Sequence, residues 1–118
     1  MKISICIAVL NSHEIVRRQL LHFKAMDLPD DVEIIFADDN SDPPLEGELK
    51  NFSIHQTGFK EKWTQPAARN YAVKHATGEY LIVTDIDHII TKKLIEAVRN
   101  CEFDVLRFKR QAGVLDAF

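Results

Sequence analysis

Residues 80–88 of this 118-residue chain read YLIVTDIDH, an apolar run that ends in two acids separated by one residue. The run Tyr80–Thr84 is rich in aromatic and β-branched residues, which predicts a buried strand of a parallel sheet. Asp85 and Asp87 would then leave the carboxyl end of that strand, where open α/β sheets bind their ligands. Two carboxylates there can hold a divalent cation through hard oxygen ligands. Taken alone, so short a motif more often marks a solvated strand end.

Apolar residues recur at helical spacing in three segments of the chain and form nearly continuous runs in others. The expected elements are, in order, strand Ile3–Val9, a helix from Asn11 to about Lys24, strand Val32–Ala37, a short strand Phe52–His55, a helix that starts near Pro66 and is capped by Gly78, strand Tyr80–Thr84, a helix through Leu94, Val98 and Cys101, and strand Val105–Lys109. This order predicts an α/β fold with a mainly parallel sheet flanked by helices.

The composition is that of an ordinary globular protein, with 46% hydrophobic and 28% charged residues. The length fits a single domain, residues 1–118. A net charge of −3 excludes the basic surface of a nucleic-acid-binding protein. The run Ile3–Leu10 is too short for a membrane segment and lacks a signal-peptide cleavage site, so we expect a cytoplasmic protein. Cys6 and Cys101 have no metal-ligand spacing and are predicted to be small core residues.

A second acidic pair follows another predicted strand. Asp38 and Asp39 come directly after Val32–Ala37, as Asp85 and Asp87 come after their strand. In a parallel sheet these four carboxylates emerge at the same edge, and we expect them to share one crevice. Their mutual repulsion would be relieved by a metal ion, or by donors such as a base N–H or a ribose hydroxyl. The alternative for residues 38–41 is a turn in which Asx side chains satisfy backbone groups.

Four segments together resemble the N-terminal, nucleotide-binding half of a family 2 glycosyltransferase with the GT-A (Rossmann-like) fold. They are residues 3–11 (ISICIAVLN), 33–41 (EIIFADDNS), 66–72 (PAARNYA) and 76–87 (ATGEYLIVTDID). Each is weak alone, but they stand in the family's order and approximate spacing, and the resemblance spans residues 1 to about 110. It implies transfer of a sugar, with inversion, from a nucleotide-diphospho-sugar to an unidentified acceptor. A UDP-sugar is the favoured donor.

The resemblance also implies roles for individual residues. The loop after the first strand lines the base pocket, the acids after the second strand contact the base, and the arginine of the A-R-N segment reaches the nucleotide. The first acid of D-x-D faces the ribose or the metal, and the second binds Mn²⁺ or Mg²⁺ beside the β-phosphate. The implied nucleotide-binding residues are Ala8, Val9, Leu10, Asp38, Asp39, Arg69 and Asp85, and the implied metal ligands are Asp87 and Asp85, with His88 as a further candidate.

Several ring side chains keep two interpretations. His88 is either an additional metal ligand or a loop histidine that faces solvent. Trp63, the one tryptophan of the chain, is either a core anchor or a stacking partner for a base or sugar. His55 and His75 have no partner at metal-ligand spacing, and we interpret them as structural.

The chain departs from the family's pattern in two places. Gln65-Pro66 stands where a glycine often precedes the A-R-N segment, so we expect that loop to differ. An inverting transfer also needs a general base for the acceptor hydroxyl. Asp104 and Asp116 are the aspartates available after the D-x-D pair, and neither lies in a segment that matches the base of relatives. We therefore expect a form truncated before the acceptor-binding half, with exposed apolar surface that promotes self-association.

Three other functions stay open on the sequence. A non-catalytic nucleotide-sugar-binding module would carry the same motifs. A phosphoacceptor receiver domain has a similar length and alternation, but it needs its acidic pair straight after the first strand, where this chain has Leu10-Asn11-Ser12. A partner-binding fragment without a ligand is the third.

Overall fold

The computed structural model describes residues 2–60, 65–102 and 104–105. Its elements are β1 (Ile3–Val9), α1 (His13–Met26), β2 (Val32–Asp38), β3 (Phe52–Gln56), α2 (Gln65–His75), β4 (Tyr80–Asp85) and α3 (Lys92–Arg99). The predicted α/β class and element order are confirmed over these residues. Trp63 lies outside the described residues. The expected strand Val105–Lys109 also lies outside them, except for its first residue, Val105.

The strands form a sheet in the order β3-β2-β1-β4, and all three pairings are parallel. Every residue of β1 is buried, and in β2 all but Glu33 are buried. Continuous apolar runs suit these central strands because both faces of the sheet are covered. Ala8 of β1 is paired in register with Ala37 on one side and with Asp85 on the other. The carboxyl ends of these three strands therefore meet at one edge of the sheet.

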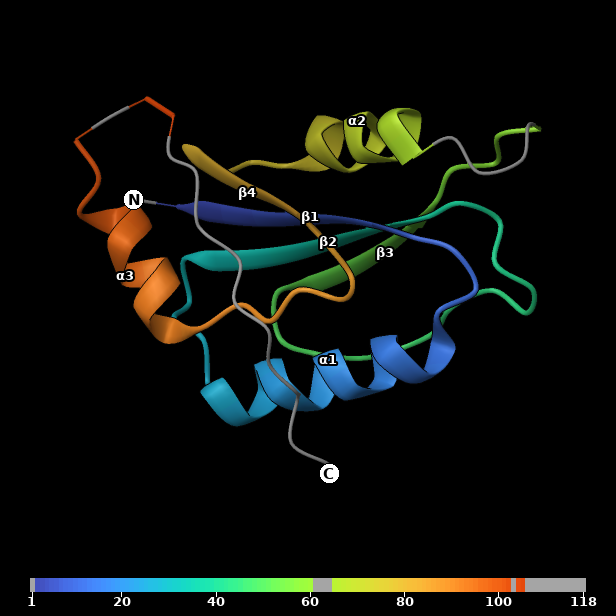
Figure 1. Ribbon diagram of the computed structural model, residues 1–118, viewed down its shortest axis with the longest axis horizontal. Helices are drawn as coiled ribbons and strands as arrows, with labels where there is room; N and C mark the ends of the chain where they lie inside the picture. The colour runs from blue at the N-terminus through green and yellow to red at the C-terminus, as the bar shows by residue number, and fades with distance from the viewer. Residues whose placement is uncertain (1, 61–64, 103, 106–118) are drawn as a thin grey trace.

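Helices cover both faces of the sheet, with α1 and α3 on one side and α2 on the other (Figure 1). α1 contributes Val16 and Phe23 to the larger core cluster. α2 packs through Ala68 and Ala72, both fully buried, and these small side chains let its backbone lie close to the sheet. Across the described segments, no helix has the length and apolar character needed to cross a bilayer.

The expected start of α1 at Asn11 is wrong. Asn11 has a left-handed backbone (φ 50°) and precedes the helix, which begins at His13 after Ser12. Asparagine adopts this conformation more readily than most residues. The Asn11 Oδ1 atom accepts a hydrogen bond from Asp42 N (2.9 Å), and the Asn11 N–H donates to Ser41 Oγ (2.8 Å). Asn11 therefore ties the loop after β1 to the loop after β2.

Gly78 does not cap α2, which ends at His75. Instead, the Gly78 N–H donates to Ser4 Oγ (2.8 Å) in β1. A Cβ atom at position 78 would lie 2.7 Å from Ser4 N and 2.9 Å from Lys2 O. Glycine is needed here because only a residue without a side chain allows so close a backbone approach.

The cysteines and two of the histidines are structural. Cys6 is buried as predicted, whereas Cys101 is only partly buried, and neither forms a disulfide. Burial and the nearby Glu33 carboxylate raise the pKa of the Cys6 thiol to about 11, so it is protonated and unreactive at neutral pH. The rings of His55 and His75 stack with centroids 4.1 Å apart, which joins β3 to α2.

Candidate metal and nucleotide site

A turn directly after β4 gathers the candidate cation ligands. The backbone N–H of His88 donates to the backbone carbonyl oxygen of Asp85 (3.1 Å), which closes the turn. One ligand atom from each of Asp85, Asp87 and His88 lies within 4.8 Å of the others. The Asp87 side chain is the most open, at 72% exposed, against 31% for Asp85 and 30% for His88. Two carboxylates and an imidazole this close together could hold a divalent cation.

Asp85 is held from the α2 side by two donors. Arg69 Nη2 forms an ion pair with Asp85 Oδ1, and Gln65 Nε2 donates to the same oxygen (2.9 Å). The guanidinium offsets part of the negative charge of the acidic pair. The Arg69 Nε atom is buried and has no hydrogen-bond partner among the described residues. The replacement of the family's glycine by Gln65 therefore adds a donor to the site.

A hydrogen bond orients the His88 ring. Thr84 Oγ1 lies 2.8 Å from His88 Nδ1, and His88 Nε2 lies 3.9 Å from Asp87 Oδ1. When Nδ1 carries the proton and donates to Thr84, the lone pair is on Nε2, the nitrogen near Asp87. Metal-binding histidines are commonly oriented by such a bond from their second nitrogen. This geometry favours the ligand interpretation of His88, which stays a prediction.

The carboxylate of Asp38 is fully buried and already bonded to the protein. It accepts hydrogen bonds from Ser41 N (3.0 Å), Leu45 N (3.0 Å) and Gln56 Nε2 (2.8 Å). Burial raises the pKa of the Asp38 carboxyl, but these hydrogen bonds outweigh burial and hold the pKa below its ordinary value. The bond from Ser41 N is of the turn type that the sequence left open for residues 38–41.

Asp38 does not join Asp85 in one open crevice, contrary to the expectation for all four acids. β1 lies between β2 and β4, so the two acidic strand ends are about 10 Å apart. Side chains alternate between the faces of a strand. Asp38 follows Phe36 toward the α1 face, whereas Asp85 is the register partner of Ala8, which packs against α2. Asp39, 2% exposed, accepts a hydrogen bond from the Thr57 hydroxyl (3.0 Å). Nucleotide contact by Asp38 or Asp39 stays a prediction.

The end of β1 lies between the two acidic strand ends. Ala8 and Val9 are buried, and Leu10 is half-buried. The Asp39 N–H donates to the Val9 carbonyl oxygen (2.9 Å), which joins the loops after β1 and β2. These three residues lie at the carboxyl end of the sheet, and their contact with a base stays a prediction.

Sequence reasoning missed two residues of α1 that hold the loop after β4. Gln19 Nε2 donates to the carbonyl oxygens of Ile86 and His88, each at 2.7 Å. His22, one turn later, also reaches a carbonyl oxygen of this loop. Gln19 is buried three residues after Val16, on the helix face that carries the core residues. The sequence signal for this role was a polar residue on an otherwise apolar helix face.

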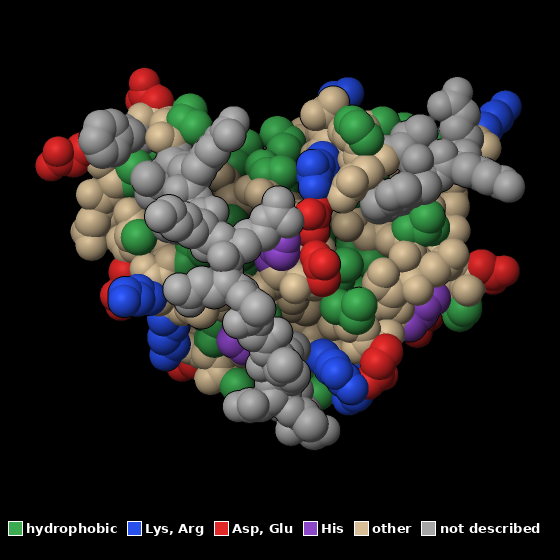
Figure 2. Space-filling view, viewed as in Figure 1, with side chains coloured by type: hydrophobic (Ala, Val, Ile, Leu, Met, Phe, Trp, Pro, Cys, Tyr) green, Lys and Arg blue, Asp and Glu red, His purple; other side chains and the backbone are tan. Residues whose placement is uncertain are grey.

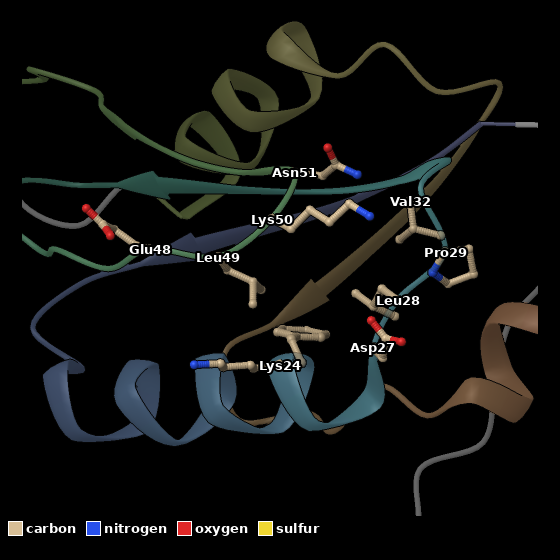
Figure 3. A pocket seen from close by; sticks show the side chains of 10 residues that line it. Lys24, Asp27, Leu28, Pro29, Val32, Glu48, Leu49, Lys50 and Asn51 are labelled. Carbon is tan, nitrogen blue, oxygen red and sulfur yellow. The ribbon is translucent and has the colours of Figure 1, made fainter.

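Two hollows of the described surface lie away from this site. One of about 510 Å³ is bounded by the end of α1 and the start of β2, at the amino ends of the strands. Figure 3 shows Lys24 and Asp27 on one side of it and Lys50 and Asn51 on the other. Another, of about 660 Å³, lies beside β3. The candidate site is instead a surface patch, where Figure 2 shows acidic, basic and histidine side chains meeting near the centre of the visible face.

Comparison with known sequences places the chain in a family. Residues 4–100 match the model of glycosyl transferase family 2. Over 99 residues the chain is 31% identical to the uncharacterized glycosyltransferase YfnE of Bacillus subtilis (strain 168). This match covers 80% of the chain and 25% of YfnE.

Solved structures agree with the fold. The crystal structure of S. aureus TarS 1-349 is similar with a TM-score of 0.66 at 23% identity, covering 84% of this chain and 31% of that one. The structure of TarS 1-349 in complex with UDP-GlcNAc has a TM-score of 0.59 at the same identity, covering 84% and 30%. The chain thus spans about a quarter of YfnE and less than a third of TarS 1-349. The predicted GT-A (Rossmann-like) fold class is confirmed, and the family match from β1 to the end of α3 shows that the chain belongs to glycosyl transferase family 2.

Proposed function

We propose that this chain carries the donor site of a glycosyltransferase that binds a nucleotide-diphospho-sugar, with a UDP-sugar favoured, together with Mn²⁺ or Mg²⁺. The observation that carries the proposal is the group of Asp85, Asp87 and His88, with ligand atoms within 4.8 Å of one another. The group follows a parallel strand at its carboxyl end, where α/β sheets bind ligands. Family membership supports the proposed reaction, transfer of the sugar to an acceptor, which we propose proceeds with inversion. The TarS complex with UDP-GlcNAc supports this class of donor.

The donor set fits a divalent cation. Carboxylate oxygens suit Mg²⁺ and Mn²⁺, whereas imidazole suits transition metals. With His88 as the third ligand, we expect Mn²⁺ to bind more tightly than Mg²⁺. Asp87 is the principal ligand in this proposal, because Asp85 is already paired with Arg69. A bound cation would supply Lewis-acid stabilisation for the diphosphate that leaves.

Arg69 and Asp39 complete the proposed donor site. The Arg69 side chain is 36% exposed, and a guanidinium binds phosphate oxygens well. Negative charge grows on the diphosphate as the sugar–phosphate bond breaks, and Arg69 would stabilise it by a charge-assisted hydrogen bond. Asp39 would accept from a base N–H beside Ala8, Val9 and Leu10.

The proposal assigns no general base. The acceptor hydroxyl must lose a proton during transfer with inversion. Asp104 is exposed after α3, and Asp116 lies outside the described residues. The proposal therefore assigns neither the general base nor the binding of the acceptor to a described side chain.

Nucleotide binding with and without Mn²⁺ tests the proposal. In calorimetric titrations of UDP, UDP-sugars, GDP-sugars and dTDP-sugars, Mn²⁺ should tighten binding to the native chain about tenfold or more. Asp87→Ala should lose this metal-dependent part. Glu96→Ala, which removes an exposed acid from α3, is the matched control and should bind as the native chain does. The proposal fails if no nucleotide shows metal-dependent binding, or if Asp87→Ala retains it.

A further inference from the structure

We propose that Gln19 of α1 is a positioning residue that holds the loop after β4 in the conformation the cation requires. The inference rests on the proposed function, because it concerns the ligands of the same cation. Gln19 would not bind the metal itself. It would act through the backbone on either side of Asp87.

The two hydrogen bonds of Gln19 flank the principal ligand. Gln19 Nε2 donates to Ile86 O and to His88 O at 2.7 Å each, and these residues stand immediately before and after Asp87. One side-chain amide thus fastens both ends of the tripeptide that carries the ligand. Gln19 is 2% exposed, so water does not compete for its donors, and hydrogen bonds in such surroundings are strong.

Other contacts make the loop a firmly held unit. His22 lies three residues after Gln19, on the same helix face, and its Nε2 lies 2.7 Å from Ile90 O. On the opposite face of the sheet, Arg69 and Gln65 hold the Asp85 carboxylate. α1 therefore fixes the backbone of the loop, while α2 fixes its first acid. Gln19 is the contact nearest to Asp87 in this arrangement.

The remaining atom of the Gln19 amide argues against a purely packing role. Gln19 Oε1 is buried and has no hydrogen-bond partner among the described residues. A buried polar atom without a partner lowers stability. An apolar side chain of similar length, such as methionine, would fill the same space without that penalty. The glutamine at this position is therefore better explained by its two bonds to the loop than by core packing.

Replacing Gln19 should weaken metal binding without removing a ligand. Gln19→Met keeps the length of the side chain and removes both donors. Loss of residues that orient metal ligands typically lowers metal affinity 10- to 100-fold. We expect about a tenfold loss of Mn²⁺ affinity, whereas UDP affinity measured without metal should not change.

The experiment compares three titrations for each variant: MnCl₂ alone, UDP alone, and UDP with saturating Mn²⁺. The matched control is Met26→Ala, a buried substitution two turns further along α1 that lowers thermal stability without removing a hydrogen bond to the loop. It should retain native Mn²⁺ affinity. If Gln19→Met does not fold, Gln19→Asn replaces it, because the shorter amide cannot span both carbonyl oxygens, and the same loss is expected.

Native Mn²⁺ affinity in the Gln19 variant would overturn the positioning role. Equal weakening in Met26→Ala would also overturn it, because the loss would then follow stability. If Asp87→Ala binds Mn²⁺ as the native chain does, or if neither binds it, the proposed function fails, and this inference fails with it. Weakening in the Gln19 variant and Asp87→Ala, but not in Met26→Ala, supports both.

Discussion

Asp38 shows at the scale of a single residue how a buried acid organises the loop after β2. Its carboxylate accepts hydrogen bonds from Ser41 N, Leu45 N and Gln56 Nε2. An asparagine would present an NH₂ group to one of these donors. We expect Asp38→Asn to lower the free energy of unfolding by about 2 kcal/mol, measured by urea denaturation at pH 7. Asp42→Asn, an exposed substitution in the same loop, should change it by less than about 0.5 kcal/mol.

The same carboxyl predicts a pH dependence of stability. The pKa of Asp38 in the folded protein lies below its ordinary value of 3.8. Its ionised form therefore adds stability that is fully present above that value and is lost as pH falls through the folded pKa. In urea denaturation, the difference between the native chain and Asp38→Asn should shrink as pH falls below about 4. A difference that stays constant into this acid range would contradict the prediction.

Some site residues could be predicted from the sequence and others could not. Asp85 and Asp87 were predictable because a buried strand and the polar residues that end it are adjacent in the chain. The role of Gln19 could not be predicted, because the carbonyl oxygens that accept its hydrogen bonds lie 67 and 69 residues away in the chain. Only the packed helix brings that amide to the loop.

At the scale of an element, the approach of the segment after α2 to β1 depends on Gly78. A Cβ atom there would lie 2.7 Å from the backbone nitrogen of Ser4, closer than packed atoms allow. We expect Gly78→Ala to destabilise the fold by about 1–3 kcal/mol, because backbone must shift to relieve the overlap. Chemical denaturation measures the loss.

Gly58 provides the comparison for this substitution. It has a left-handed backbone (φ +67°), but no atom lies within 4 Å of a Cβ built there. Gly58→Ala should therefore cost only about 1 kcal/mol, from backbone conformation alone. An equal or larger effect at position 58 would show that contact with β1 is not what requires glycine at position 78.

Helices and strands followed local patterns closely, while their ends did not. Val16 and Phe23 recur at helical spacing, and both are buried in α1. The expected capping at Asn11 failed because its side chain bonds to Asp42 in another loop. The prediction that Gly78 caps α2 was wrong for the same physical reason, because its hydrogen bond to Ser4, which is distant in sequence, sets its position.

At the scale of the whole molecule, β4 is one of the two edge strands of the sheet in the described part of the chain, and β3 is the other. Leu81 is 41% exposed and Val83 is 48% exposed on β4. Strand edges with apolar side chains tend to pair with a second copy. We expect analytical ultracentrifugation to detect self-association in the micromolar range. Val83→Lys should weaken the association about tenfold, because pairing through β4 would bury the charge of the lysine.

Ile15→Lys serves as the control for this prediction. Ile15 is 41% exposed on α1, away from the strand edge, so its replacement should leave the association constant unchanged. A native chain that stays monomeric over this range, or an equal effect of the two lysine variants, would contradict association through β4.

Local pattern is sufficient for the α/β class, for most of the helices and strands, and for the two acids after β4, because periodicity and strand-end chemistry act between near neighbours in the chain. It does not reveal that β1 separates the two acidic strand ends, or that Asp38 and Asp85 face opposite sides of the sheet. Nor does it show that α1 fastens the loop around Asp87 while Arg69 pairs with Asp85. These features depend on strand order and helix packing, which arise only when segments distant in sequence bury their surfaces together.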